Sequence, residues 1–208
     1  MSAYQTEEEQ VEALKRWWKE NGTSVVAGIV LGLGGIFGWQ AWGNYQDRVG
    51  KEAAQAFTQM LEAQRRGDSA SASKQAELLR LEYDGNGYAL FSALAQARLK
   101  LDEGDSVGAR SQLEWVMAQS DNPALKHLAR LNLARILLSE GDREGAAKLA
   151  EVTDGGFAGE FAVLRGDIAL ARGDKQGAHD AYALAMTLEV SYPDLLQMKL
   201  DDLAMGTL

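Results

Sequence analysis

Hydrophobic residues form one uninterrupted run near the start of the chain, between two polar segments. Residues 25–39 include no charged side chain, and the run extends to residues 23–42 with a single amide. A helix of about 20 residues rises about 30 Å, the thickness of a bilayer core. Trp17 and Trp18 precede the run and Trp42 closes it, and indoles prefer the depth of the lipid headgroups. The pattern predicts a transmembrane anchor over residues 23–42.

Two other kinds of segment share this composition: the buried core helix of a soluble domain and a cleaved signal peptide. A run that is uncharged on every side and bounded by aromatic residues favours a membrane over a core. A signal peptide begins with a short basic segment, whereas this run follows a polar tail, residues 1–22, that carries five glutamates. We therefore expect an anchor that stays uncleaved.

The tail predicts a short amphipathic helix. Thr6 and Glu9 have the spacing of a capping box, and Asn21-Gly22 is typical of a helix end. The helix either lies on the inner leaflet of the membrane or docks on a partner protein. Lysine and arginine are slightly more frequent just before the span than just after it, which favours a cytoplasmic N-terminus and an exported C-terminal domain.

Glycines inside the span are candidates for a contact with another membrane helix. Gly28 and Gly32 have the GxxxG spacing, as do Gly34 and Gly38, and small residues let two helices approach closely. Such pairs also arise by chance in a glycine-rich span, so both interpretations stay open. Gly28 and Gly32 are the candidate contact.

After the span, the pattern G-D-x-x-G-A occurs three times, starting at Gly104, Gly141 and Gly173. A glycine ends one helix in the left-handed conformation, and the following aspartate caps the next helix. Seven residues before each glycine stands a further small residue, where a paired helix must approach: Ala97, Ala134 and Gly166. The intervals of 37 and 32 residues predict helix-turn-helix repeats of the tetratricopeptide type.

The composition supports this fold, because alanine and leucine dominate it and β-branched residues are scarce. The predicted fold class is all-α, with a single N-terminal transmembrane helix followed by a tetratricopeptide-like helical-repeat domain. The expected organisation is a tail (1–22), the anchor (23–42), a connecting helix (43–72) and the repeat domain (73–208). Helices are expected over 44–66, 73–81, 88–103, 107–119, 123–140, 143–151, 159–172, 175–189 and 193–204.

Charge and cysteine content exclude several classes of function. The 208 residues carry a formal net charge of −9, which disfavours nucleic-acid binding because that affinity comes largely from neutralising phosphates. The chain has no cysteine, so thiolate metal sites and cysteine nucleophiles are excluded. His127 and His179 stand in no catalytic or metal-binding motif. We expect no catalytic, cofactor-binding or metal-binding residues.

A repeat domain without such a site acts through its surfaces. Aligning the repeats on their first glycines places one set of residues on the concave face that the first helices line. The candidate partner-binding residues are Phe91, Leu94, Arg98, Leu101, Leu131, Arg135 and Leu138. They would form an apolar groove with embedded arginines, suited to a peptide or a partner's helix. In a small, tightly wound domain the same residues would instead pack on one another.

Several segments of the chain resemble the YfgM family. They are the segment 10–16, which is followed by two aromatic residues and Glu20-Asn21-Gly22, the segment 173–178, and Gln197-Met198-Lys199-Leu200 near the C-terminus. The similarity covers essentially the whole chain, in the same order of tail, anchor and repeats. Members of that family are described as ancillary subunits of the SecYEG translocon in Gram-negative bacteria.

The resemblance implies a non-enzymatic, single-span protein of the cell inner membrane, with a cytoplasmic N-terminus and a periplasmic C-terminal domain. The implied partners are the SecYEG translocon, the membrane-anchored periplasmic chaperone PpiD and emerging secretory proteins. The residues alone also allow an anchored assembly factor for another envelope complex, or a hydrolase with an unrecognised site. Crosslinking in intact membranes distinguishes the scaffold at the translocon from the assembly factor.

Overall fold

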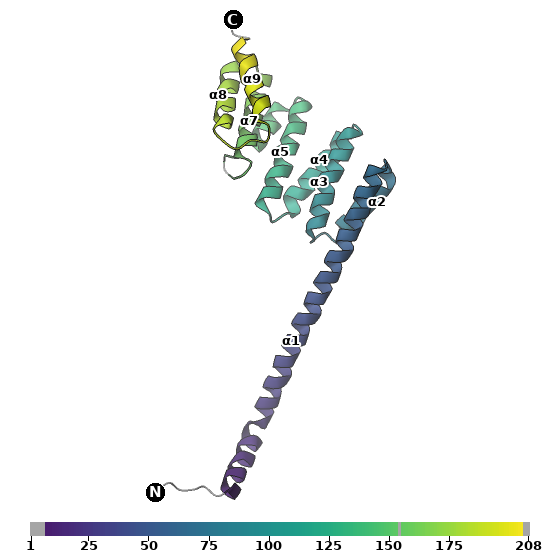
Figure 1. Cartoon of the computed structure of the whole chain (residues 1–208), viewed down its shortest axis with the longest axis vertical. Coiled ribbons are helices and arrows are strands. Elements are labelled where there is room, and N and C mark those ends of the chain that lie inside the picture. The colour runs from purple at the N-terminus through teal and green to yellow at the C-terminus, as the bar shows by residue number, and fades with distance from the viewer. Residues whose placement is uncertain (1–6, 154, 206–208) are drawn as a thin grey trace, which may run out of the picture. The chain divides into compact units, whose positions relative to one another are not determined.

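The computed structural model describes residues 7–153 and 155–205, and this part of the chain contains nine helices and no strand (Figure 1). The helices are α1 (Glu7–Arg65), α2 (Ser69–Glu82), α3 (Gly87–Asp102), α4 (Ser106–Gln119), α5 (Pro123–Ser139), α6 (Arg143–Leu149), α7 (Ala158–Ala171), α8 (Lys175–Met186) and α9 (Pro193–Met205). The all-α prediction is confirmed. From α2 onward, the observed helices match the predicted ones in order, but α2 begins four residues before the expected 73–81 and α8 ends three residues before the expected end at 189.

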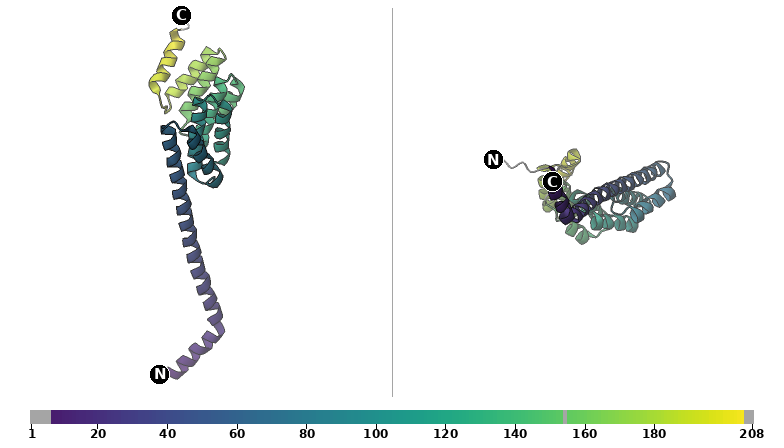
Figure 2. Two further views of the ribbon diagram at one scale, coloured as in Figure 1. Left: turned by 90° about the vertical axis from the view of Figure 1, so that its right-hand side faces the viewer. Right: turned by 90° about the horizontal axis from the view of Figure 1, so that it is seen from below.

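Helix α1 continues through Asn21 and Gly22, so the helix end predicted there is wrong. Gly22 is not among the described glycines with a positive φ, which such an end requires. Instead, the Asn21 amide donates to the carbonyl oxygen of Trp17 at 3.0 Å. Extending an existing helix is favourable, so the following residues continue it, and Figure 2 shows one ribbon that bends in its purple part. Thr6, the predicted cap, lies outside the described residues.

The chain divides into two compact units, Met1–Glu52 and Ala53–Leu208. In the first unit the apolar side chains of the predicted span face outward, with Leu31 77% exposed and Trp39 74% exposed. Only 6% of the most apolar stretch is buried. A core helix of a soluble domain would bury this surface, so α1 is a candidate membrane span by exposure as well as by length and composition.

The repeat junctions share one backbone geometry. The first glycines of the three motifs are Gly104, Gly141 and Gly173, and their φ angles lie between +81° and +89°. Residues that carry a Cβ atom rarely adopt this left-handed conformation, whereas glycine adopts it readily. The aspartate after each glycine accepts a hydrogen bond at 2.8 Å from the backbone N–H three residues later. Gly67-Asp68 repeats the geometry one junction earlier, with Ser71 as donor at 3.0 Å. The glycine therefore ends one helix and the aspartate caps the next.

The second glycine of the motif makes room for that cap. A Cβ atom at any of these positions would lie 2.2 to 2.3 Å from an oxygen of the capping carboxylate: Gly108, Gly145 and Gly177. The carboxylate of the capping aspartate therefore packs directly on the backbone of the second glycine. This is why the motif carries glycine at its fifth position although glycine is a poor helix former.

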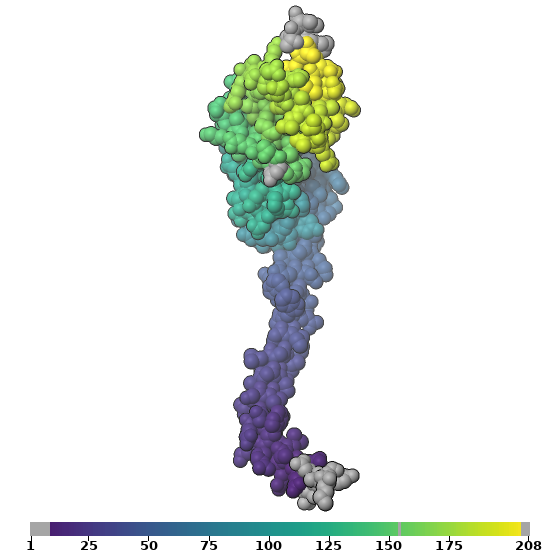
Figure 3. Space-filling view, turned by 90° about the vertical axis from the view of Figure 1, so that its left-hand side faces the viewer, coloured from purple at the N-terminus to yellow at the C-terminus, as the bar shows by residue number. Residues whose placement is uncertain are grey.

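Small residues allow the paired helices of the repeats to pack closely. Ala97 and Ala134 are 3% and 0% exposed, and Gly166 lies against the ring of Tyr182. Helix α9 closes the repeat unit by packing its buried leucines on the cluster around Tyr182. Figure 3 shows α9, in yellow, beside the light green helices that precede it.

Candidate partner-binding groove

An open groove of 390 Å³ lies between α3 and α5, the first helices of two successive repeats. Its lining residues are Leu94, Ala97, Arg98, Leu101, Leu113, Asn132, Arg135, Ile136 and Ser139. Four of the predicted partner-binding residues therefore meet in one groove: Leu94, Arg98, Leu101 and Arg135.

Helical periodicity explains how the groove is built. Residues 94, 98 and 101 are four and three positions apart on α3, so they share one face of that helix. Asn132, Arg135 and Ser139 have the same relation on α5. Leu113 of α4, which is 1% exposed, closes the groove between them. The groove is thus a consequence of the repeat itself.

The other three predicted residues do not line the groove. Leu131 is 2% exposed and packs in a core cluster with Phe161 of α7, so it is not accessible to a partner. Leu138 is partly buried against the same cluster. Both residues are covered because α5 also packs on α7, which an alignment of repeats does not show. Phe91 is 47% exposed on α3, outside the groove.

The two arginines of the groove are held differently. Arg98 pairs with Asp102 at 3.1 Å, but its side chain is 79% exposed, so this ion pair contributes little. Arg135 donates to Glu160 of α7 at 3.0 Å, and Glu160 also accepts from the backbone N–H of Ser191 at 2.8 Å. Burial raises the pKa of Glu160, but these hydrogen bonds and the charge of Arg135 outweigh burial, so the pKa lies below its ordinary value. Arg135 is therefore fixed in place, while Arg98 is free to change partner.

Three further residues of α5, which the alignment of repeats does not single out, also line the groove: Asn132, Ile136 and Ser139. Helical spacing is the signal that identifies them: Asn132 and Ser139 lie three residues before and four after Arg135, and Ile136 lies four after Asn132. The Ser139 hydroxyl donates to the carbonyl oxygen of Ile136 at 2.7 Å, so it is occupied within the helix. Asn132 adds an amide to an otherwise apolar and cationic wall.

Gly28 and Gly32 lie on the exposed surface of α1, in the first compact unit. Apart from the two chain neighbours and the backbone of α1 itself, no described atom lies within 4 Å of a Cβ built at either position. Each glycine therefore leaves a shallow, open strip on the apolar helix. Contact of this strip with a second membrane helix stays a prediction.

The described residues contain no group of three or more His, Cys, Asp or Glu side chains that could hold a metal ion. The ring of His127 packs edge-on against Phe161, with 6.0 Å between the ring centroids. His179 lies at the surface, 3.4 Å from the carboxylate of Asp180. The two histidines thus occupy a packing position and a surface position.

Comparison with known proteins agrees with this architecture. The family model of a tetratricopeptide repeat-like domain matches residues 15–205, a range that includes the candidate membrane span. The chain is 31% identical over 207 residues to the ancillary SecYEG translocon subunit of Escherichia coli (strain K12), covering 98% of this chain and 100% of the relative. A protein of the same name from Haemophilus influenzae is 28% identical over 185 residues, or 88% and 90% of the two chains. No solved structure matches. By these matches, the chain belongs to the family of ancillary SecYEG translocon subunits.

Proposed function

We propose that this protein is a non-enzymatic inner-membrane scaffold that associates with the SecYEG translocon and links emerging periplasmic proteins to chaperones. The observation that carries this proposal is the full-length similarity to relatives named ancillary SecYEG translocon subunits. The similarity includes the candidate membrane span as well as the repeats. In the proposed topology the N-terminus is cytoplasmic and the repeat domain is periplasmic.

The membrane anchor determines where in the cell the repeat domain meets its partners. A membrane helix confines the domain to the surface onto which secreted chains emerge, which raises its effective concentration beside the translocon. A groove of 390 Å³ then needs only modest affinity to hold a partner briefly. A scaffold of this kind acts through position and needs no catalytic group.

The lining of the groove indicates the kind of segment that it binds. Leu94 and Leu101 offer apolar contacts, and Arg98 and Arg135 offer two guanidinium groups. An amphipathic helix or short peptide with an acidic residue beside its apolar side chains complements this surface. Arg98 is the cation that reaches the partner, because its exposed pair with Asp102 is easily broken. PpiD and emerging secretory proteins are the proposed sources of the segment.

The glycine strip of α1 is the proposed contact with the translocon inside the membrane. Gly28 and Gly32 leave open space beside the helix backbone, where a second helix can pack closely. In this proposal the two parts of the chain make different contacts. The span holds the protein at the translocon, and the groove holds the chaperone or the emerging chain.

Crosslinking in intact membranes, followed by purification of the tagged chain, tests the proposal. We expect SecYEG subunits and PpiD among the products. A matched control replaces residues 23–42 with an unrelated single span, and this variant should lose the SecYEG products. Products that consist of envelope-assembly proteins, without SecYEG, would contradict the proposal in favour of an assembly factor.

Protease digestion of spheroplasts tests the orientation separately. Protease added outside should digest the repeat domain and spare an epitope placed on the tail. Digestion of the tail epitope with an intact repeat domain would overturn the proposed topology and, with it, access of the groove to periplasmic proteins.

A further inference from the structure

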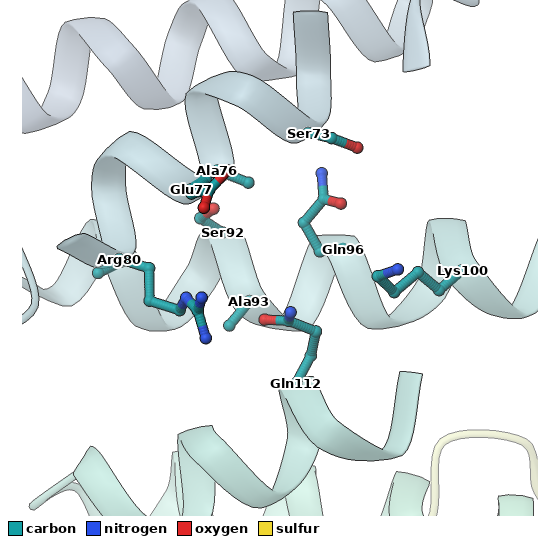
Figure 4. Close-up of a pocket in the computed structure, with 10 residues that line it drawn as sticks. Ser73, Ala76, Glu77, Arg80, Ser92, Ala93, Gln96, Lys100 and Gln112 are labelled. Carbon is teal, nitrogen blue, oxygen red and sulfur yellow. The ribbon is translucent and has the colours of Figure 1, made fainter. Parts of the chain in front are cut away.

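A second pocket, distinct from the groove, lies between α2 and α3 and faces α4 (Figure 4). Its volume is 220 Å³, and it shares no lining residue with the groove. The pocket uses another face of α3, and its polar lining residues are Ser73, Glu77, Arg80, Ser92, Gln96, Lys100 and Gln112. We refer to it as the polar pocket.

Gln96 is the unusual residue of the polar pocket. It is 4% exposed, yet its Nε2 has no hydrogen-bond partner among the described residues. Figure 4 shows its side chain pointing from α3 across the pocket toward Ser73 of α2. A buried amide donor without a partner is unfavourable for folding, and such groups are rare in native proteins. The donor is, however, aimed into a space that a ligand can occupy.

The charges around the pocket favour an uncharged ligand group at its buried end. Lys100 is neutralised by Asp105 at 2.8 Å. Glu77 and Arg80 carry opposite charges and are both exposed, at the mouth of the pocket. The remaining lining beside Gln96 is three alanines and Ser92, whose hydroxyl donates to the sulfur of Met60 at 3.3 Å. A carboxylate placed there would lose its hydration without a counter-charge, whereas a neutral carbonyl loses less and accepts from Gln96.

We propose that the polar pocket binds the side-chain carboxamide of a glutamine or asparagine from a partner polypeptide. The carbonyl oxygen of the ligand accepts from Gln96 Nε2, and its NH₂ group donates to the carboxylate of Glu77 or to Gln112 Oε1. A carboxamide is both acceptor and donor, so one group bonds to Gln96 and to a second lining residue. The volume of 220 Å³ suits a single side chain inserted from outside. This site is additional to the proposed scaffold function and does not depend on it.

Peptide binding to the purified full chain in detergent micelles tests the site. The probes are three capped tripeptides, acetyl-Ala-X-Ala-amide, in which X is glutamine, glutamate or methionine, three side chains of similar size. Nitrogen-15 labelling of the glutamines reports on the Gln96 side chain directly by NMR. We expect a saturable shift of its signal with the glutamine peptide, and Kd values at least about tenfold higher for the other two, as loss of a hydrogen bond predicts. Equal or tighter binding of the glutamate peptide would instead identify an anion site, and no shift with any peptide would overturn the proposal.

Gln96→Met provides a second test, because methionine keeps the length of the side chain and removes the amide. We expect this variant to lose its preference for the glutamine peptide while its melting temperature stays equal or rises, since no internal hydrogen bond is lost. Gln119→Met, at an exposed position outside the pocket, is the matched control and should keep the preference. A clear fall in melting temperature for Gln96→Met alone would show that the amide supports the fold and would overturn its assignment as a binding group.

Discussion

The ring of Tyr182 packs on the bare backbone of Gly166, so closely that a Cβ atom at residue 166 would lie 2.3 Å from Cε1 of Tyr182. Tyr182 is fully buried, and its hydroxyl donates to the carboxylate of Asp167 at 2.6 Å. Lys199 of α9 donates to the same carboxylate. One tyrosine therefore joins α7, α8 and α9, and it does so because α7 carries glycine at the point of contact.

Replacing that glycine should disturb the end of the repeat unit. Gly166→Ala forces the Tyr182 ring to move, and overpacking of this kind destabilises by about 1–3 kcal/mol. Thermal unfolding of the full chain in detergent measures the loss. Gly87→Ala is the control, because beyond its chain neighbours and its own helix backbone no described atom lies within 4 Å of a Cβ there, and its φ is not positive. Equal melting temperatures for the two variants would show that the close contact between Gly166 and Tyr182 does not contribute to stability.

The same tyrosine predicts a loss of stability at high pH. Burial, together with the hydrogen bond and charge of Asp167, raises the pKa of Tyr182 above its ordinary value of 10.0. The unfolded chain therefore ionises this tyrosine first, so its contribution to stability is complete below about pH 10 and is lost as the pH rises further. Denaturant unfolding between about pH 8 and pH 12 should show the advantage of the wild type over Tyr182→Phe shrinking only above pH 10. An advantage that does not change with pH would contradict this assignment.

The capping aspartate and the second glycine of each motif should be energetically coupled. In the wild type, Gly145→Ala places a Cβ 2.3 Å from Oδ2 of Asp142 and displaces the cap, at a cost of about 1 kcal/mol. In an Asp142→Ala background there is no carboxylate to displace. The same Gly145→Ala change should then stabilise by up to about 1 kcal/mol, because alanine is the better helix former. A double-mutant cycle followed by thermal unfolding measures the coupling, and strict additivity would disprove it.

The sequence predicted the helices well because each repeat junction is a local signal. Gly104-Asp105 combines a left-handed helix end with an N-terminal cap, and both depend on residues only a few positions apart. Asn21-Gly22 carries a similar local signal but lies inside a continuous helix. Residues typical of a helix end do not end the helix here, because the backbone stays helical into the apolar span.

The sites were harder to predict because they depend on contacts between repeats. Leu94 and Leu131 hold equivalent positions in their repeats, yet Leu94 lines the groove and Leu131 is buried against α7. The role of Gln96 could not be predicted from the sequence, because glutamine is common on exposed helix faces. Its burial depends on how α2 packs on α3. Such differences appear only when neighbouring helices are in place.

Removing the groove arginines should weaken partner capture without unfolding the domain. The double variant Arg98→Ala, Arg135→Ala should capture PpiD or an emerging chain at least about tenfold less well, since truncating one partner of a desolvated charge pair costs about 2–5 kcal/mol. Pull-down from a mild detergent extract measures capture, and circular dichroism of the full chain checks the fold. Arg110→Ala, which removes an ion pair with Glu140 outside the groove, is the control. Unchanged capture by the double variant would move the binding site to the Gly28 and Gly32 strip.

Site-specific photocrosslinking in living cells tests the central claim most directly, namely that this membrane-anchored protein presents its groove to partners at the SecYEG translocon. A photoreactive residue replaces Leu101 in the groove or, as the control, Leu81, which is 68% exposed on α2 and lines neither pocket. We predict crosslinks from position 101 to PpiD, to emerging chains or to translocon subunits, and none of these from position 81. Crosslinks of equal yield from both positions, or products from position 101 that consist only of other envelope proteins, would contradict the account.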